Sequence, residues 1–291
     1  MLKAKNAVLG FSLVQSEEII DRALAEDLSG GDVTTEALIP NSQRGTGFIV
    51  VKEKGILAGL DVAKRVFHRV DPELEISAFL EDGSKVEPGS IIARVEGKVA
   101  SILKAERVAL NFLQRLSGVA SETNRYVEAV KGLPVRIMDT RKTTPGLRLL
   151  EKYAVRVGGG ENHRMNLGDG ILIKDNHLAA LRSQGLNIKE IIAKARQNVP
   201  KRLKIEVEVK TMPEALEAAE AGVDIIMLDN MSLEDIREAV KSIHGRALVE
   251  ASGGITRDKV RAIAEARVDF ISVGALTHSV KALDISLKLT I

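Results

Sequence analysis

From residue 133 onward, short apolar runs alternate with amphipathic stretches, and this alternation constrains the fold more than any other feature of the chain. The runs are VRIMD, GILIK, LKIEVEV, DIIMLD, ALVEA and DFISV, and helix-like stretches such as TMPEALEAAEAG and SLEDIREAVKSIHG separate most of the later ones. Alternation at this spacing indicates βα units and a parallel sheet. A full eight-unit barrel takes about 250 residues. The stretch 116–275 is shorter, so we expect an incomplete, open α/β barrel.

The chain before residue 133 has a different pattern. Two β-rich stretches, GTGFIVVKEKGILAG and LEISAFLEDGSKVEPGSIIARVEG, contain Asp-Gly and Pro-Gly pairs that mark turns, which predicts a small sheet with hairpins. Residues 14–27 and 103–130 have helical spacing, and we expect the second helix to break at Ser117-Gly118. Near residue 291, ALDISLKLTI alternates apolar and polar residues. This period of two predicts an edge strand that returns to the first sheet.

Composition excludes several classes of protein. Hydrophobic residues make up 45% of the chain and charged residues 28%, as in folded globular proteins, and the net charge of +2 gives no general attraction to nucleic acid or to an anionic membrane. No run reaches the ~20 apolar residues of a membrane span. Cysteine is absent, which rules out disulfides and thiolate metal sites. With no signal-like segment near Met1, we expect a cytoplasmic protein.

Charged residues or glycines follow all six strand-like runs. In βα barrels and open α/β sheets, ligands bind at the carboxyl ends of the strands. Cations come after the first two runs, and they would bind an anionic substrate, because arginine pairs with carboxylate or phosphate through two parallel hydrogen bonds. These cations are Arg141, Lys142, His163, Arg164 and Lys174.

The later runs end in different chemistry. Glu208 and Asp229 offer carboxylates that suit ribose hydroxyls or Mg²⁺, which prefers oxygen ligands. The stretches ASGGIT and SVGAL place glycines ahead of helices, where free backbone N–H groups and the helix dipole bind phosphate. The residues alone therefore predict a phosphorylated sugar and Mg²⁺ beside a multiply negative organic acid.

The long ordered motif MDTRKTTPGLRLLEKYAVRVGGGENHRMNLGDGILIKDNH, followed by EVEV, IIMLDNM, EASGGIT and ISVGALTHS, closely resembles the quinolinate phosphoribosyltransferase family. ALAEDLSGGDVTT and ERVALNFLQRLSGVAS extend the likeness over nearly the whole chain. The resemblance implies an α/β sandwich domain at 1–115, joined by the strand at 276–291, and a barrel catalytic domain at 116–275. It also implies transfer of phosphoribosyl from phosphoribosyl pyrophosphate to quinolinate, giving nicotinate mononucleotide, pyrophosphate and carbon dioxide in NAD biosynthesis.

The resemblance also assigns roles to residues. Lys142 corresponds to a lysine near both substrates, and Glu208 and Asp229 to acids that hold the ribose and the Mg²⁺, directly or through pyrophosphate. Members of the family are homodimers with shared active sites, some of them assembled further, so Arg107 is expected to reach the site of the partner subunit. The quinolinate-binding cations match Arg107, Arg141, His163, Arg164 and Lys174, and the 5′-phosphate turns match Ser252, Gly253, Gly254, Ser272, Val273, Gly274 and Ala275.

Two other classes of function stay open at this stage. Lys142 or Lys174 could act as a Schiff-base nucleophile in a barrel lyase or aldolase, because neighbouring arginines would lower the pKa of a lysine. The stretch DGSKVEPGSIIARVEG also resembles a biotinyl or lipoyl carrier hairpin, in which Lys85 would be modified. Trapping with borohydride would reveal a Schiff base, and mass spectrometry would reveal a modified Lys85.

Overall fold

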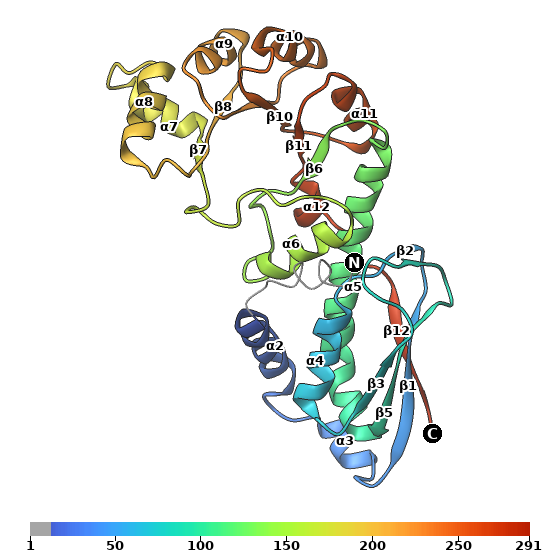
Figure 1. Ribbon diagram of the computed structural model, residues 1–291. Coiled ribbons are helices and arrows are strands. Elements are labelled where there is room, and N and C mark those ends of the chain that lie inside the picture. The colour runs from blue at the N-terminus through green and yellow to red at the C-terminus, as the bar shows by residue number, and fades with distance from the viewer. Residues whose placement is uncertain (1–12) are drawn as a thin grey trace. The chain divides into compact units, whose positions relative to one another are not determined.

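The computed structural model describes residues 13–291, with side chains from Ser16 onward, and these residues form two compact units (Figure 1). The first unit comprises the described residues up to Asn124 together with Thr143–Gly159 and Ala275–Ile291. The second comprises Arg125–Lys142 and Gly160–Gly274. The chain therefore crosses between the units after residues 124, 142, 159 and 274. The domain boundary between residues 115 and 116 stays a prediction.

The first unit contains a four-stranded antiparallel sheet in the order β12-β1-β5-β3. Along β1, Gly47, Ile49 and Val51 are buried and alternate with more exposed residues, so one face of the strand packs on the core. The predicted return of the last strand is confirmed, because Thr290 of β12 pairs with Thr46 of β1. The strands are β1 (Arg44–Val51), β2 (Gly55–Ile56), β3 (Glu75–Ala78), β4 (Lys85–Val86), β5 (Ile91–Lys98) and β12 (Ile285–Thr290), with β2 and β4 forming a separate pair.

Helices α4 and α5 lie along one face of this sheet (Figure 1). Val66 and Phe67 of α4 are fully buried and contribute to the core. The carboxylate of Asp82 accepts the N–H groups of Gly59 and Leu60 at 2.8 and 3.0 Å, which satisfies donors at the start of α4. The helices of this unit are α2 (Leu13–Leu28), α3 (Val33–Leu38), α4 (Leu60–Val70), α5 (Val99–Ala129, which runs on into the second unit), α6 (Arg148–Val157) and α12 (Ala275–His278).

The predicted break at Ser117-Gly118 is wrong, because α5 runs without interruption through both residues. Ser117 Oγ accepts the N–H of Ala58 at 3.0 Å and donates to its carbonyl at 3.2 Å. At Gly118 a Cβ atom would come within 2.3 Å of the carbonyl oxygen of Lys281. The Ser-Gly pair therefore allows other segments to approach the helix closely, and it does not end the helix.

The second unit contains a six-stranded parallel sheet in the order β6-β11-β10-β9-β8-β7. All six runs predicted as strands are strands, and the sheet stays open because β6 and β7 form its two edges. Glu206, Val207 and Val209 of β8 are buried, as expected for a strand covered on both sides. The strands are β6 (Arg136–Met138), β7 (Ile171–Ile173), β8 (Ile205–Val209), β9 (Ile225–Asp229), β10 (Leu248–Ser252) and β11 (Phe270–Ser272).

Helices follow the strands of this sheet and lie on its outer side (Figure 1). Side chains at the helix starts fix where they begin: Thr211 and Ser232 accept the N–H groups of Glu214 and Asp235. None of the helices in the described part of the chain is long and apolar enough to cross a membrane. The helices are α7 (Asp175–Arg182), α8 (Ile188–Asn198), α9 (Met212–Glu220), α10 (Leu233–Ile243) and α11 (Arg257–Glu265).

Candidate active site

A cavity of about 480 Å³ opens at the carboxyl ends of the parallel strands in the second unit. Most of its polar lining consists of residues that the sequence singled out at the ends of the runs. Both the predicted cations and the predicted acids contribute to it. The predicted residues that line it are Arg141, Lys142, His163, Arg164, Lys174, Glu208, Asp229, Ser252, Gly253, Gly254 and Ser272.

The cationic wall of the cavity carries Arg141, Lys142, Arg164 and Lys174. Burial first, and then the positive charge of nearby Arg141, lower the pKa of Arg164. Arg164 Nη1 donates to the carbonyl of Gly170 at 3.2 Å, which fixes the guanidinium. Lys142 and Lys174 line the same cavity. An anion bound there would relieve the repulsion between the cations.

Two carboxylates stand on neighbouring strands at the same edge. Glu208 is in β8 and Asp229 ends β9, and these strands pair in parallel. Burial first, and then the negative charge of Asp229, raise the pKa of Glu208. A pair of carboxylates at one edge of the sheet forms a fitting site for a divalent cation with oxygen ligands, such as Mg²⁺.

The glycine turn after β10 allows a close approach between its backbone and the side chain of Asn230. Gly253 has a φ of 88°, and a Cβ atom there would lie 2.5 Å from the side chain of Asn230. Asn230 donates its N–H to the carbonyl of Ser252 at 2.9 Å. On the next strand, the buried Ser272 Oγ has no hydrogen-bond partner among the described residues. A buried hydroxyl that lacks a partner beside a glycine turn suits the oxygens of a phosphate.

A fully buried acid holds the segment that carries His163 and Arg164. Asp139 Oδ1 accepts the backbone N–H of His163 at 2.9 Å, and its Oδ2 accepts the side-chain amide of Asn162 at 2.6 Å. The segment also adds a bridge beside β6, between Met138 and Glu161. Asp139 therefore fixes both the backbone and a side chain of this segment at the edge of the sheet.

Two further buried acids contact the ring of His163. Its Nε2 lies 3.1 Å from Glu206 Oε2 and 3.5 Å from Glu250 Oε2. Burial lowers the pKa of His163, whereas the hydrogen bonds to Glu206 and Glu250 raise it. Against this, Nδ1 accepts the N–H of Arg164 at 2.8 Å, which an imidazolium could not do. In this geometry the ring is neutral and donates from Nε2.

This protonation state has a consequence for the neighbouring acids. Burial raises the pKa of Glu206, which favours a proton within the cluster of His163, Glu206 and Glu250. Their potential ligand atoms lie within 4.8 Å of one another, a spacing that a metal ion could use. Nε2, however, carries the hydrogen that the acids share, and Arg164 and Lys204 line the adjoining cavity of about 360 Å³. We therefore infer that Glu206 and Glu250 hold the ring of His163 in place.

The remaining predicted residues lie elsewhere. Arg107 belongs to α5 in the first unit, and its side chain is exposed. Val273 is buried and donates its N–H to the carbonyl of Met138 at 2.9 Å, and Gly274 and Ala275 follow it in the chain. These three residues follow Ser272, which lines the cavity.

Two models of one protein family match most of the chain. The model of the quinolinate phosphoribosyl transferase N-terminal domain matches residues 32–117, and the model of the C-terminal domain of the same family matches residues 119–288. The chain belongs to the quinolinate phosphoribosyltransferase family. The family's two domain models meet within α5.

Relatives cover almost the whole chain. A probable nicotinate-nucleotide pyrophosphorylase (carboxylating) of Bacillus subtilis is 43% identical over 278 residues, which are 96% of this chain and 94% of that protein. A mitochondrial quinolinate phosphoribosyltransferase (decarboxylating) of Nicotiana glauca is 43% identical over 94% of this chain and 82% of that protein. The crystal structure of NadC from Streptococcus pyogenes has a TM-score of 0.92 and 46% identity, covering 96% of this chain and 98% of that one.

Sequence reasoning missed the buried acids that support the cavity. Glu206 and Glu250 stand inside the runs LKIEVEV and ALVEA, where a charged residue is unusual in a strand covered on both faces. Asp139 ends the run VRIMD. An ionisable residue inside or at the end of a buried strand was the signal that could have indicated these acids. The interpretation considered only the residues at strand ends, and it therefore selected Glu208 and not Glu206.

Proposed function

We propose that this chain transfers phosphoribosyl from phosphoribosyl pyrophosphate to quinolinate and releases pyrophosphate and carbon dioxide, forming nicotinate mononucleotide for NAD biosynthesis. The observation that carries the proposal is the single cavity in which cations, acids and a phosphate-type turn meet, in a chain of this family. Each of these groups suits one part of the two substrates.

The cationic wall is assigned to quinolinate, which carries two carboxylates. Arg141, Arg164 and Lys174 would hold them, with Arg107 contributed by the partner subunit. His163 has both ring nitrogens engaged within the chain, so its part is to fix the backbone N–H of Arg164. A cavity with several clustered cations favours a dianion over a monoanion.

The other wall is assigned to phosphoribosyl pyrophosphate. The N–H groups and hydroxyls of the two turns would bind the 5′-phosphate, and Lys142 would neutralise the pyrophosphate. Glu208 and Asp229 would hold the ribose hydroxyls and Mg²⁺, directly or through pyrophosphate, and the ion supplies positive charge to the leaving group. The 5′-phosphate turns comprise Ser252, Gly253, Gly254, Ser272, Val273, Gly274 and Ala275.

The chain's residues act mainly by holding and orienting charge. The pyridine nitrogen forms a bond to the ribose carbon as the bond to pyrophosphate breaks, and the negative charges of Glu208 and Asp229 favour the positive carbon that develops. The nitrogen is then a cation. It stabilises the electron pair left on the adjacent carbon when the 2-carboxylate departs as carbon dioxide, and a proton from solvent completes the product.

The test is an assay of purified protein with quinolinate, phosphoribosyl pyrophosphate and Mg²⁺, following nicotinate mononucleotide. We expect formation of product with quinolinate and negligible turnover with nicotinate, which has one carboxylate. A missing carboxylate would leave cations unpaired at a cost of about 2–5 kcal/mol. Comparable turnover of the two acids would contradict the assignment of the cationic wall.

Neither alternative function gains support from these findings. The family match spans both domains and includes the hairpin around Lys85, which lies in β4 and pairs with β2. Borohydride with a carbonyl substrate is expected to leave Lys142 and Lys174 unmodified. Mass spectrometry of the protein isolated from cells is expected to show unmodified Lys85.

We extend the proposal to a cytoplasmic homodimer. The absence of cysteine fits a reducing compartment. Arg107, which the family likeness assigns to the partner's site, has an exposed side chain on α5. Light scattering of the purified protein tests the dimer, and cell fractionation tests the location.

A further inference from the structure

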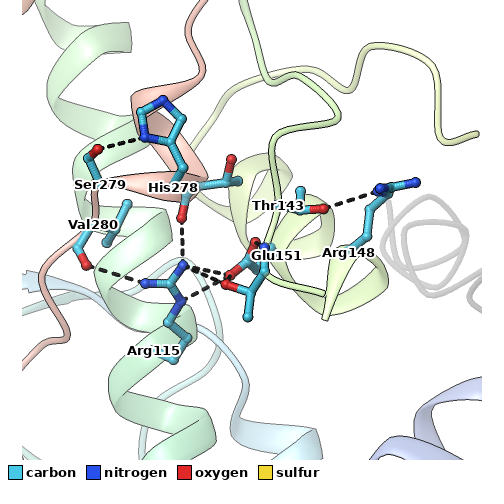
Figure 2. Close-up of polar contacts among 9 residues, drawn as sticks. Arg115, Thr143, Arg148, Glu151, His278, Ser279 and Val280 are labelled. Carbon is cyan, nitrogen blue, oxygen red and sulfur yellow. Dashed lines mark hydrogen bonds and ion pairs between the residues drawn. The ribbon is translucent and has the colours of Figure 1, made fainter. Parts of the chain in front are cut away.

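A guanidinium in the first unit holds a fully buried carboxylate. Arg115 Nε and Nη2 donate to Glu151 Oε1 at 3.0 and 2.6 Å, as Figure 2 shows, and the Glu151 side chain has no exposed surface. A buried carboxylate is costly unless hydrogen bonds and an opposite charge compensate it. The Arg115–Glu151 pair therefore has a fixed geometry, and its remaining donors and acceptors can form hydrogen bonds that hold other segments in place.

The first of these segments is Thr143-Thr144. Glu151 Oε2 accepts the N–H of Thr144 at 3.0 Å, and Glu151 Oε1 accepts its hydroxyl at 2.7 Å. Arg115 Nη2 donates to the same hydroxyl at 3.1 Å. Arg148 Nε donates to Thr143 Oγ1 at 3.0 Å (Figure 2). In the chain, Thr143 follows Lys142 directly, and Lys142 lines the substrate cavity.

The second segment is Thr277–Val280. Arg115 Nη2 donates to the carbonyl of Thr277 at 2.5 Å, and Nη1 donates to the carbonyl of Val280 at 3.3 Å. The neighbouring Gln114 accepts the N–H of Leu283 at 2.9 Å. Thr277 comes soon after the turn that begins at Ser272, so this segment also continues directly from substrate-binding residues.

We propose that Arg115 and Glu151 are positioning residues, which hold the two segments that leave the cavity after Lys142 and after the 272–275 turn. The inference rests on the proposed function, because it is those residues that we assign to phosphoribosyl pyrophosphate. One guanidinium anchors both segments, so its loss releases both together. Arginine is required, because its spread nitrogens reach acceptors that the single nitrogen of lysine cannot reach at once.

The matched control is Ser117, which lies in the same helix and makes its hydrogen bonds to Ala58. Ser117→Ala leaves buried backbone groups without their partner and destabilises the first unit without touching either segment. Arg115→Met removes every hydrogen bond of the guanidinium, to Glu151, Thr144, Thr277 and Val280, and leaves the hydrogen bonds of Glu151 to Thr144 in place. Thr144→Val is a milder change that removes only the hydroxyl of the first segment, and Thr144→Ser restores that hydroxyl.

The first measurement is amide hydrogen exchange without substrates, which is independent of any activity. In Arg115→Met, exchange in 140–146 and 272–280 is expected to rise at least about tenfold, because both segments lose their hydrogen bonds to the guanidinium and Glu151 loses its paired charge. In Thr144→Val the rise is confined to 140–146. Ser117→Ala leaves both segments unchanged. Equal exchange in Arg115→Met and Ser117→Ala would overturn the proposal.

The second measurement is steady-state kinetics. Arg115→Met is expected to raise the KM for phosphoribosyl pyrophosphate and to lower kcat, with kcat/KM falling roughly 10- to 100-fold, since displacements of about 1 Å at a reacting centre have effects of this size. The Kd of quinolinate measured alone should change less than about threefold. Arg115→Lys recovers part of the loss, and Thr144→Ser recovers most of the loss of Thr144→Val.

The outcomes separate the two proposals. A wild-type protein that makes no nicotinate mononucleotide contradicts the proposed function, whatever the exchange data show. An active wild type whose Arg115→Met variant loses activity only in proportion to its folded fraction, as Ser117→Ala does, contradicts the positioning role.

Discussion

Asp139 accepts the backbone N–H of His163 at 2.9 Å, and this contact ties the cationic segment of the cavity to the end of β6. Both oxygens of the buried carboxylate are used, the second by the side-chain amide of Asn162. A side chain with two acceptors is therefore needed at this position.

Asp139→Asn is expected to weaken quinolinate binding and to destabilise the fold. Asparagine has one acceptor oxygen, so its NH₂ group would face a donor, at a cost of about 1–3 kcal/mol. Urea unfolding measures the stability, and calorimetry measures the affinity for quinolinate. Asp269→Asn is the control, because Asp269 accepts the N–H of Val249 at 2.8 Å at the other end of the strands. A loss of affinity equal in the two variants would speak against a specific role of Asp139.

Gly253→Ala is expected to impair the use of phosphoribosyl pyrophosphate. The added Cβ would displace Asn230 and distort the turn, in addition to the strain of a positive φ. Gly222→Ala separates these effects, because Gly222 has a φ of 70° and open space around it. We expect both variants to lose about 1 kcal/mol of stability from strain, and only Gly253→Ala to show a raised KM for phosphoribosyl pyrophosphate.

Replacing Glu208 or Asp229 with alanine should damage the use of phosphoribosyl pyrophosphate and the dependence on Mg²⁺. Quinolinate binding measured alone should barely change, because we assign the dianion to the cations of the cavity and not to these acids. Titrations of each substrate and of Mg²⁺ against wild type and both variants check this. A large loss of quinolinate affinity would mean that these acids belong to the other substrate.

Arg107→Ala and Lys174→Ala should each be nearly inactive alone. If each site draws Arg107 from the partner subunit, a mixed dimer has one site with both lesions and one with none. At equal mixing, half of the dimers are hybrids, so activity should return to roughly a quarter of wild type. Native mass spectrometry establishes that subunits have exchanged. Confirmed exchange with no return of activity would place Arg107 outside the partner's site.

The six strands and the cavity at their ends were predictable because they depend on local patterns. Apolar runs such as DIIMLD indicate buried strands, and parallel strands bring their ends to one edge. The site lining followed from that geometry alone, without any knowledge of side-chain contacts. Glu208 and Asp229 meet because their strands are neighbours.

The errors and omissions come from contacts between distant segments. The local sequence predicted a helix break at Gly118. The missing side chain instead permits Lys281 to approach the helix, and the residues next to Gly118 do not indicate this contact. Likewise, nothing near Arg115 in the sequence indicates that its guanidinium reaches Glu151 and the carbonyl of Thr277. Residues that hold a site in place are specified by the completed fold, whereas residues that line it are specified by their strands.

The pairing of Thr46 with Thr290 imposes an order on biosynthesis. A ribosome has made all of the second unit before it adds β12, so the parallel sheet can form during translation while β1 still lacks this neighbour. The first sheet is complete only after β12 has been made, and until then β1 exposes an unpaired edge that favours aggregation. Nascent chains stalled before residue 285 should therefore protect 160–274 from protease while 44–98 is still cleaved, and early protection of both regions would refute this order.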